Sequence, residues 1–276
     1  MLSWFNYARL FYFIVTAINL AILIWAIYDT NDNAGERYYK THGYTMCLYN
    51  VLVSIVIRSE IVHWLIHEIF VNIGRFSPHS FKHVIVGGLL NMGGIHASCG
   101  TMALIWLCYG TYYNWTTLYT SVVVSKVSVA ACITLGISIL AAFPLVRYMY
   151  HNQYEMGHRF FGWAGLALLW VIIFFQYSWN IDINTTTGEV TTYQGSVNAQ
   201  TMFSNPEIYI VMISTFFVIF PWLDKVKVRV ECPSKQIAIL KFDGRVPAYR
   251  FGRISTSPLF EWHAFAISSY SADAKV

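Results

Sequence analysis

Residues 10–28 read Leu-Phe-Tyr-Phe-Ile-Val-Thr-Ala-Ile-Asn-Leu-Ala-Ile-Leu-Ile-Trp-Ala-Ile-Tyr, a run of 19 residues that carries no charge. A helix needs about 20 apolar residues to cross the hydrocarbon core of a bilayer, so this run is long enough to span it. The run lacks a small-residue cleavage site, and we therefore interpret it as a membrane span and not as a signal peptide.

The composition of the whole chain agrees with this interpretation. Of its 276 residues, 56% are hydrophobic and only 12% are charged, whereas a soluble domain carries about 25% charged residues. The net charge is +4, but lysine and arginine lie mostly in loops and in the tail, which favours a membrane topology over nucleic-acid binding. The five cysteines imply no disulfide framework, and we identify no internal repeat.

Six segments have nearly the length of a bilayer span. They are residues 10–28, 46–70, 83–109, 118–146, 160–179 and 207–223. The sequence therefore predicts an all-α polytopic membrane bundle of about six transmembrane helices over residues 1–223. Residues 224–276 form a second, cytoplasmic segment rich in β-strands, with alternating Val226, Val228 and Val230 and apolar runs at 237–242 and 262–267.

The charges of the loops predict the orientation of the bundle. Basic residues lie between spans two and three, between spans four and five, and after span six, which places these loops and both termini in the cytoplasm. The loops after spans three and five contain no lysine or arginine, but they contain sequons at Asn114 and Asn184. We expect a multi-pass glycoprotein of the plasma membrane or the secretory pathway.

Ionisable residues in the second span indicate a functional or structural cluster. Glu60, His63 and His67 share one face of a helix, and buried ionisable groups in a span usually face the bundle interior. His63 and His67 are four residues apart, the spacing at which two histidines can bind one metal ion. In the third span, the glycine pairs 87–88 and 93–94 predict close helix packing.

The tail contains the most distinctive motif. Residues 257–269 read Ser-Pro-Leu-Phe-Glu-Trp-His-Ala-Phe-Ala-Ile-Ser-Ser and resemble the flavin-binding strand of the ferric reductase and NADPH oxidase superfamily. The resemblance implies that the tail is the start of a flavin-binding barrel, with FAD as the cofactor and His263, Phe265 and Ser268 as its contacts. Ala264 and Ala266 replace the proline and the threonine of the family pattern.

Two membrane segments extend the resemblance. Residues 93–100 read Gly-Gly-Ile-His-Ala-Ser-Cys-Gly, and residues 151–163 read His-Asn-Gln-Tyr-Glu-Met-Gly-His-Arg-Phe-Phe-Gly-Trp. With the tail motif they resemble the fungal TmpA-type membrane flavoproteins, relatives of ferric reductases that are also found fused to adenylate-forming enzymes. The resemblance implies electron transfer or redox signalling from a flavin at the cytoplasmic face. Residues 1–276 contain no nicotinamide domain, which leaves three alternatives open: the chain is truncated, a separate reductase chain or another nicotinamide-binding partner supplies the electrons, or the activity is lost.

Haem is the second cofactor that this resemblance suggests. Ferric reductases hold two haems between spans three and five through histidines about 14 residues apart. Here His96 follows His83 by 13 residues, which leaves it about 140° away around a helix, and no second histidine follows His158 in span five. A two-haem ladder therefore does not fit this sequence, and a single haem between His83 and His158 stays open as an alternative.

Two other functions stay open at this stage. Four histidines in two His-x3-His pairs, His63 with His67 and His79 with His83, are compatible with a membrane metal-dependent oxygenase or hydroxylase. The missing nicotinamide domain and the two alanine replacements are compatible with a membrane scaffold or signalling protein without catalysis. The sequence does not settle whether the chain is an enzyme; if it is one, we expect an oxidoreductase.

Overall fold

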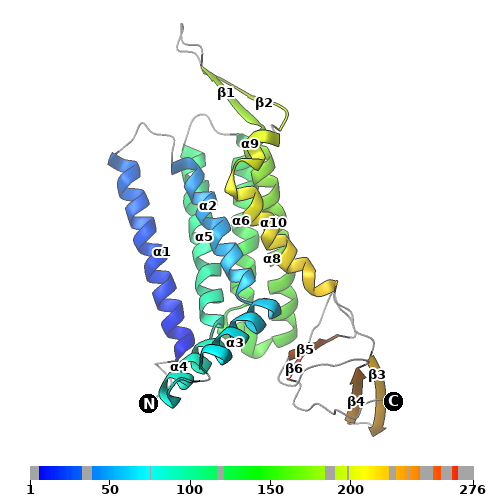
Figure 1. The fold of residues 1–276 in the computed structure, drawn as a ribbon. Helices are drawn as coiled ribbons and strands as arrows, with labels where there is room; N and C mark the ends of the chain where they lie inside the picture. The colour runs from blue at the N-terminus through cyan, green and yellow to red at the C-terminus, as the bar shows by residue number, and fades with distance from the viewer. Residues whose placement is uncertain are drawn as a thin grey trace. The chain divides into compact units, whose positions relative to one another are not determined.

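The computed structural model describes residues 6–32, 39–74, 76–116, 121–183, 190–197, 199–223, 228–234, 237–242, 251–255 and 263–266. The chain divides into two compact units, Met1–Phe217 and Val218–Val276. The first unit is a helix bundle and the second contains short strands, so the described chain is mostly helical (Figure 1).

Five long helices form the bundle. They are α1 (Tyr7–Asp32), α2 (Tyr39–Val56), α5 (Gly93–Thr116), α6 (Val122–Ala141) and α8 (His151–Ser178). Helix α2 packs along α5, α6 packs along α8, and α1 packs on α5 (Figure 1). Contacts between α5 and α6 join the two helix pairs. The bundle is thus built from two helix pairs with α1 on the outside.

Three described helices are long and apolar enough to cross a membrane, namely Tyr7–Tyr28, Val122–Ala141 and His151–Ser178. A fourth span results if the bent pair Gly43–Val56 and Glu60–Gly74 is counted as one. The prediction of six spans is therefore not confirmed. Helix α5 has 24 residues, but the polar residues that it buries at the centre of the bundle lower its hydropathy.

The second predicted span is broken in the structure. Helix α3 (Glu60–Gly74) follows α2 after a bend of 73°. The bend releases the carbonyl of Ile57 from helix pairing, and His63 Nε2 lies 2.7 Å from that oxygen. Glu60 is exposed, so the expectation that the ionisable residues of this segment face the bundle interior is wrong for Glu60.

The third predicted span is also broken. Helix α4 (His79–Leu90) ends at Asn91, whose side-chain amide donates to the carbonyl of Gly87 at 2.7 Å. Helix α5 then starts at Gly93. A glycine costs a helix interior about 0.5–1 kcal/mol relative to alanine, and the glycine pairs on both sides of Asn91 weaken the helix at this point.

Gly87 and Gly94 serve close packing, as predicted, whereas Gly93 does not. A Cβ atom added at Gly94 would overlap the backbone carbonyl of Ala8 in α1, and one added at Gly87 would collide with the ring of Tyr7. Gly43 in α2 faces the backbone of Gly110 in α5. A Cβ atom added at Gly43 would lie only 2.7 Å from the Gly110 Cα. Small residues thus allow α1 and α2 to approach α5 backbone to backbone.

Short elements connect the long helices. Helix α7 (Pro144–Met149) joins α6 to α8, and strands β1 (Trp179–Ile183) and β2 (Val190–Gln194) form an antiparallel hairpin after α8. Helices α9 (Ala199–Phe203) and α10 (Pro206–Ile219) follow, and a 3-10 turn, η1 (Phe220–Trp222), ends the sequence of helices. The sequence analysis predicted a loop where β1 and β2 lie.

Successive long helices run in opposite directions. As a result, the start of α1, helices α3 and α4, and helix α7 lie at one end of the bundle, while β1 and β2 lie at the other end (Figure 1). Contacts of α4 with both α1 and α3 agree with this arrangement.

The prediction of a glycosylation sequon required Asn114 to lie in a loop, but it does not. It belongs to α5 and is only 5% exposed. Its side-chain nitrogen, the atom to which a glycan would be attached, donates to the Tyr44 hydroxyl at 2.6 Å. The prediction of glycosylation at Asn114 is therefore wrong for the folded chain, and Asn184 lies outside the described residues.

The second unit contains two separate antiparallel hairpins. Strand β3 (Val228–Ser234) pairs with β4 (Ile237–Phe242), and β5 (Phe251–Ile254) pairs with β6 (His263–Ala266). The three predicted strands are confirmed, and β5 is an additional one. The described strands form two-stranded sheets, and a flavin-binding barrel is not shown.

Candidate functional site

The candidate site begins with a histidine on α5 that is bound by a serine on α2. His96 Nδ1 lies 2.8 Å from the Ser54 carbonyl oxygen and 2.9 Å from its hydroxyl oxygen. The Ser54 hydroxyl also donates to the His96 carbonyl at 3.2 Å. Because a carbonyl oxygen only accepts, Nδ1 carries the proton of the neutral ring, and Nε2 keeps its lone pair.

The same arrangement occurs on the second helix pair. His158 on α8 places Nδ1 at 2.9 Å from the Ser138 carbonyl oxygen and 3.1 Å from its hydroxyl oxygen on α6. The Ser138 hydroxyl donates to the His158 carbonyl at 2.9 Å. The Nε2 atom of His158 is therefore also left with a lone pair.

A glycine follows each histidine after four residues and makes room for the serine. Ideal Cβ atoms at Gly100 and Gly162 would lie 3.7 Å from Ser54 Oγ and 3.6 Å from Ser138 Oγ, respectively. Two helix pairs thus carry one motif, a serine on the first helix and His-x3-Gly on the second.

The two histidines meet where the helix pairs join. Their ring centroids lie 5.9 Å apart, and the ring planes are inclined by 77°. Both side chains are half-buried. Among the residues that the structure describes, neither Nε2 atom has a hydrogen-bond partner. We call these four residues, Ser54, His96, Ser138 and His158, the paired-histidine site.

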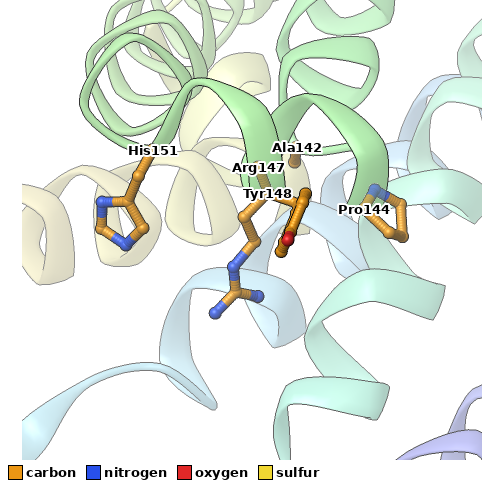
Figure 2. Close-up of a pocket in the computed structure, with 5 residues that line it drawn as sticks. All are labelled: Ala142, Pro144, Arg147, Tyr148 and His151. Atoms are coloured by element: carbon orange, nitrogen blue, oxygen red, sulfur yellow. The ribbon is translucent and has the colours of Figure 1, made fainter.

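A row of rings leads from this site to the end of the bundle. Tyr154 lies one helical turn before His158, with 6.3 Å between the ring centroids, and His151 lies 5.8 Å from Tyr154. The guanidinium carbon of Arg147 lies 5.5 Å from the centroid of the Tyr154 ring. Figure 2 shows Arg147 and His151 beside Tyr148 and Pro144 in an open pocket at this end.

Polar contacts around the site hold the helices in register. Thr16 on α1 bonds Ser98 on α5 at 2.8 Å, and Trp106 donates to Asn19 Oδ1 at 3.2 Å. Farther along the bundle, Thr45 and Tyr177 donate to the two carboxyl oxygens of Glu207 at 2.6 and 3.0 Å. The position of the two histidines is therefore determined by several helices at once.

The structure brings only one of the two expected haem ligands to this site. His158 belongs to it, but His83 is exposed on α4 and has no contact with His158 among the described residues. The partner of His158 is His96, which the sequence analysis excluded because of its angle to His83. The angle between His83 and His96 was calculated for one continuous helix. It does not apply to the structure, because His83 lies on α4 and His96 on α5.

The alternative metal site on α3 is not supported for His63. Its Nε2 atom is engaged with the Ile57 carbonyl, and the side chain of His67 lies outside the described residues. Within the described part of the chain, no group of three or more His, Cys, Asp or Glu residues is arranged to hold a metal ion. A multi-histidine oxygenase centre is thus not found there.

The residues expected to contact a flavin lie in the second unit. His263 is exposed on β6 opposite Ile254 of β5. The side chain of Phe265 and the whole of Ser268 lie outside the described residues. The described strands thus show no flavin site around His263.

Sequence reasoning missed Ser54, Ser138 and the role of His96. One signal was present, because His-x3-Gly occurs both at 96–100 and at 158–162. The serines gave no signal, since they lie 42 and 20 residues from their histidines.

Fold and site together define a helical protein. Three of its described helices are long and apolar enough to cross a membrane, and a histidine pair lies between two helix pairs. No family model matches the chain. No solved structure matches it significantly.

Two curated relatives are adenylate-forming reductases of Coprinopsis cinerea. Adenylate-forming reductase 03009 is 33% identical over 274 residues, which cover 94% of this chain and 24% of the relative. Adenylate-forming reductase 06235 is 31% identical over 273 residues, which cover 95% of this chain and 25% of the relative. The chain therefore spans about a quarter of the length of these relatives.

The relatives correct the functional interpretation made from sequence. They are named adenylate-forming reductases, which is a different function from that of a ferric-reductase-like membrane flavoprotein. The interpretation of the chain as an FAD-dependent electron-transfer protein of that kind is therefore wrong. The names also describe neither an oxygenase nor a scaffold.

Proposed function

We propose that this chain is a membrane-embedded module that works together with an adenylate-forming reductase. One observation carries the proposal: nearly the whole chain aligns with about a quarter of two such enzymes at 31–33% identity. The module would hold the reductase at a membrane, and the catalytic steps of adenylation and reduction would belong to the other three quarters.

The chain fits this role as a multi-pass membrane protein with cytoplasmic termini. Lys82 on α4 and Arg147 on α7 lie at the same end of the bundle as the start of α1 (Figure 1). By the positive-inside rule, the end of a membrane bundle that carries the basic residues stays in the cytoplasm. A reductase that uses ATP would find its substrates on that side.

A chimera tests this function. The quarter of adenylate-forming reductase 03009 that aligns would be replaced by this chain, and a second variant would lack that quarter altogether. We expect the chimera to stay in the membrane fraction and to keep both ATP–pyrophosphate exchange and reductase activity, and the deletion variant to be released from the membrane. A chimera that is soluble, or whose membrane attachment does not depend on this quarter, would contradict the proposal.

The paired-histidine site is proposed to hold a transition-metal centre. Ligating histidines usually donate their other ring N–H to a carbonyl or carboxylate, and Ser54 and Ser138 accept such bonds here. An ion bonded to one nitrogen of each ring at about 2.0–2.1 Å is compatible with ring centroids 5.9 Å apart. The two unpaired ring nitrogens would bind one imidazole-ligated ion, which would supply a Lewis acid or a redox centre.

Metal analysis of three variants checks this prediction. His96→Ala and His158→Ala are each expected to lower the bound metal of the detergent-purified chain by tenfold or more, about the loss typical of damaged metal sites. His83→Ala is the control and should leave the metal content unchanged. A Soret band would identify a porphyrin iron, and metal without that band a free ion. Wild-type protein that contains no bound metal and shows no Soret band would refute the proposed metal site.

A further inference from the structure

The end of the bundle between α6 and α8 contains an open pocket of about 440 Å³ that none of the functions above uses. Its walls are Ala142, Pro144, Arg147, Tyr148 and His151 (Figure 2). Arg147 and Tyr148 come from the six-residue helix α7, and His151 begins the 28-residue helix α8. The pocket therefore lies at the corner where the chain leaves one candidate span and enters the next.

The pocket is positively charged. Arg147 is exposed and makes no ion pair with any carboxylate that the structure describes. The contact of its guanidinium with the Tyr154 ring, 5.5 Å from the centroid, holds the side chain in place. The first turn of α8 contains no acidic residue, so the partial positive charge of this helix end adds to that of Arg147.

The surroundings of the pocket are those of a membrane interface. Tyr148 is 88% exposed, and Phe143 and Leu145 beside it are 58% and 60% exposed. Exposed aromatic and aliphatic side chains at the end of a span are typical of residues that contact headgroups and the upper acyl chains. A ligand in this pocket would thus contact the Arg147 guanidinium and the Tyr148 ring, and it would have the apolar side chains of Phe143 and Leu145 beside it.

We propose that this pocket binds the phosphate headgroup of an anionic phospholipid. A phosphate accepts hydrogen bonds from a planar guanidinium in a two-pronged geometry, and Arg147 offers that group without a competing carboxylate. Basic pockets between membrane helices on the cytoplasmic side are the usual place for such headgroups. The acyl chains of the lipid would lie along Phe143 and Leu145.

Lipid-dependent thermal unfolding of the delipidated protein in detergent tests this proposal. Phosphatidic acid is expected to raise the unfolding midpoint by about 3 °C or more at saturation. Phosphatidylcholine with the same acyl chains should not do so. In Arg147→Gln the apparent affinity for phosphatidic acid should fall about fivefold or more, and Arg147→Lys should restore part of it.

Lys126→Gln is the matched control, because Lys126 is an exposed cation near the opposite end of α6. It should bind phosphatidic acid like the wild type. Equal losses in Lys126→Gln and Arg147→Gln, or no loss in Arg147→Gln, would overturn the pocket as the binding site. Inorganic phosphate serves as a separate probe, and an equal shift with phosphate alone would overturn the assignment to a lipid.

Discussion

Replacement of Gly94 by alanine is expected to lower the stability of the bundle by about 1–3 kcal/mol, the range measured for overpacked cores. The added methyl group would overlap the Ala8 carbonyl, carbonyl carbon and Cα, which belong to the backbone of α1 and not to a flexible side chain. Helix α1 would have to move away from α5 as a whole.

The neighbouring contacts make that movement costly. The Thr16–Ser98 bond and the Trp106–Asn19 bond tie α1 to α5 farther along the same interface, at 2.8 and 3.2 Å. A displaced α1 stretches both hydrogen bonds, which are partly buried, and a typical hydrogen bond contributes about 1 kcal/mol. The thermal midpoint of the purified protein in detergent measures the result, with about 2–4 °C expected per kcal/mol.

Gly93→Ala provides the matched control one residue away. No atom lies within 4 Å of the Cβ that it would add. Alanine is the better helix former by about 0.5–1 kcal/mol, so this variant should be as stable as the wild type or slightly more stable. If Gly94→Ala behaved like Gly93→Ala, the close approach of α1 and α5 would be wrong.

Removal of the Glu207 carboxyl group is the second change with a large expected effect. Glu207 is 8% exposed at the start of α10. It accepts from Thr45 of α2 at 2.6 Å and from Tyr177 of α8 at 3.0 Å. Glu207→Ala leaves two donors without their acceptor and loosens three helices at once, so we expect a loss of about 2–4 kcal/mol.

Two further variants separate the hydrogen bonds from the mere loss of a carboxylate. Glu207→Gln keeps the shape and one acceptor oxygen, and it should lose about half as much stability. Glu155→Ala on α8 removes a carboxyl group that has no hydrogen bond with the described residues, so its effect should stay within about 0.5 kcal/mol. If Glu155→Ala lowered the unfolding midpoint as much as Glu207→Ala does, the hydrogen bonds of Glu207 would not be the cause of its stabilising effect.

The helical class of the bundle and several of its elements could be predicted from local patterns. Long apolar runs predicted α1, α6 and α8, and alternating residues predicted β3, β4 and β6. These predictions succeed because apolar length and side-chain period are properties of a few consecutive residues. The same reasoning located His158 but offered no basis for choosing its partner.

The breaks within the second and third predicted spans could not be derived from hydropathy. A window average stays apolar across Arg58 and Ser59 and across Asn91, although the chain turns there. The turns are stabilised by side chains that reach a released carbonyl, His63 at Ile57 and Asn91 at Gly87. Such bonds depend on the folded geometry and leave no trace in a hydropathy average.

The sequence by itself determined that this chain is a helix-rich protein with segments long and apolar enough to span a membrane and with a strand-containing tail. Only the tertiary structure decided that His96 and His158 form the pair and that Ser54 and Ser138 orient their rings. The physical reason is distance along the chain: the serines lie 42 and 20 residues away from the histidines that they bind. Contacts of that kind are set by which helices pack together, and here the glycines that let the backbones of α1 and α2 reach α5 share in that choice.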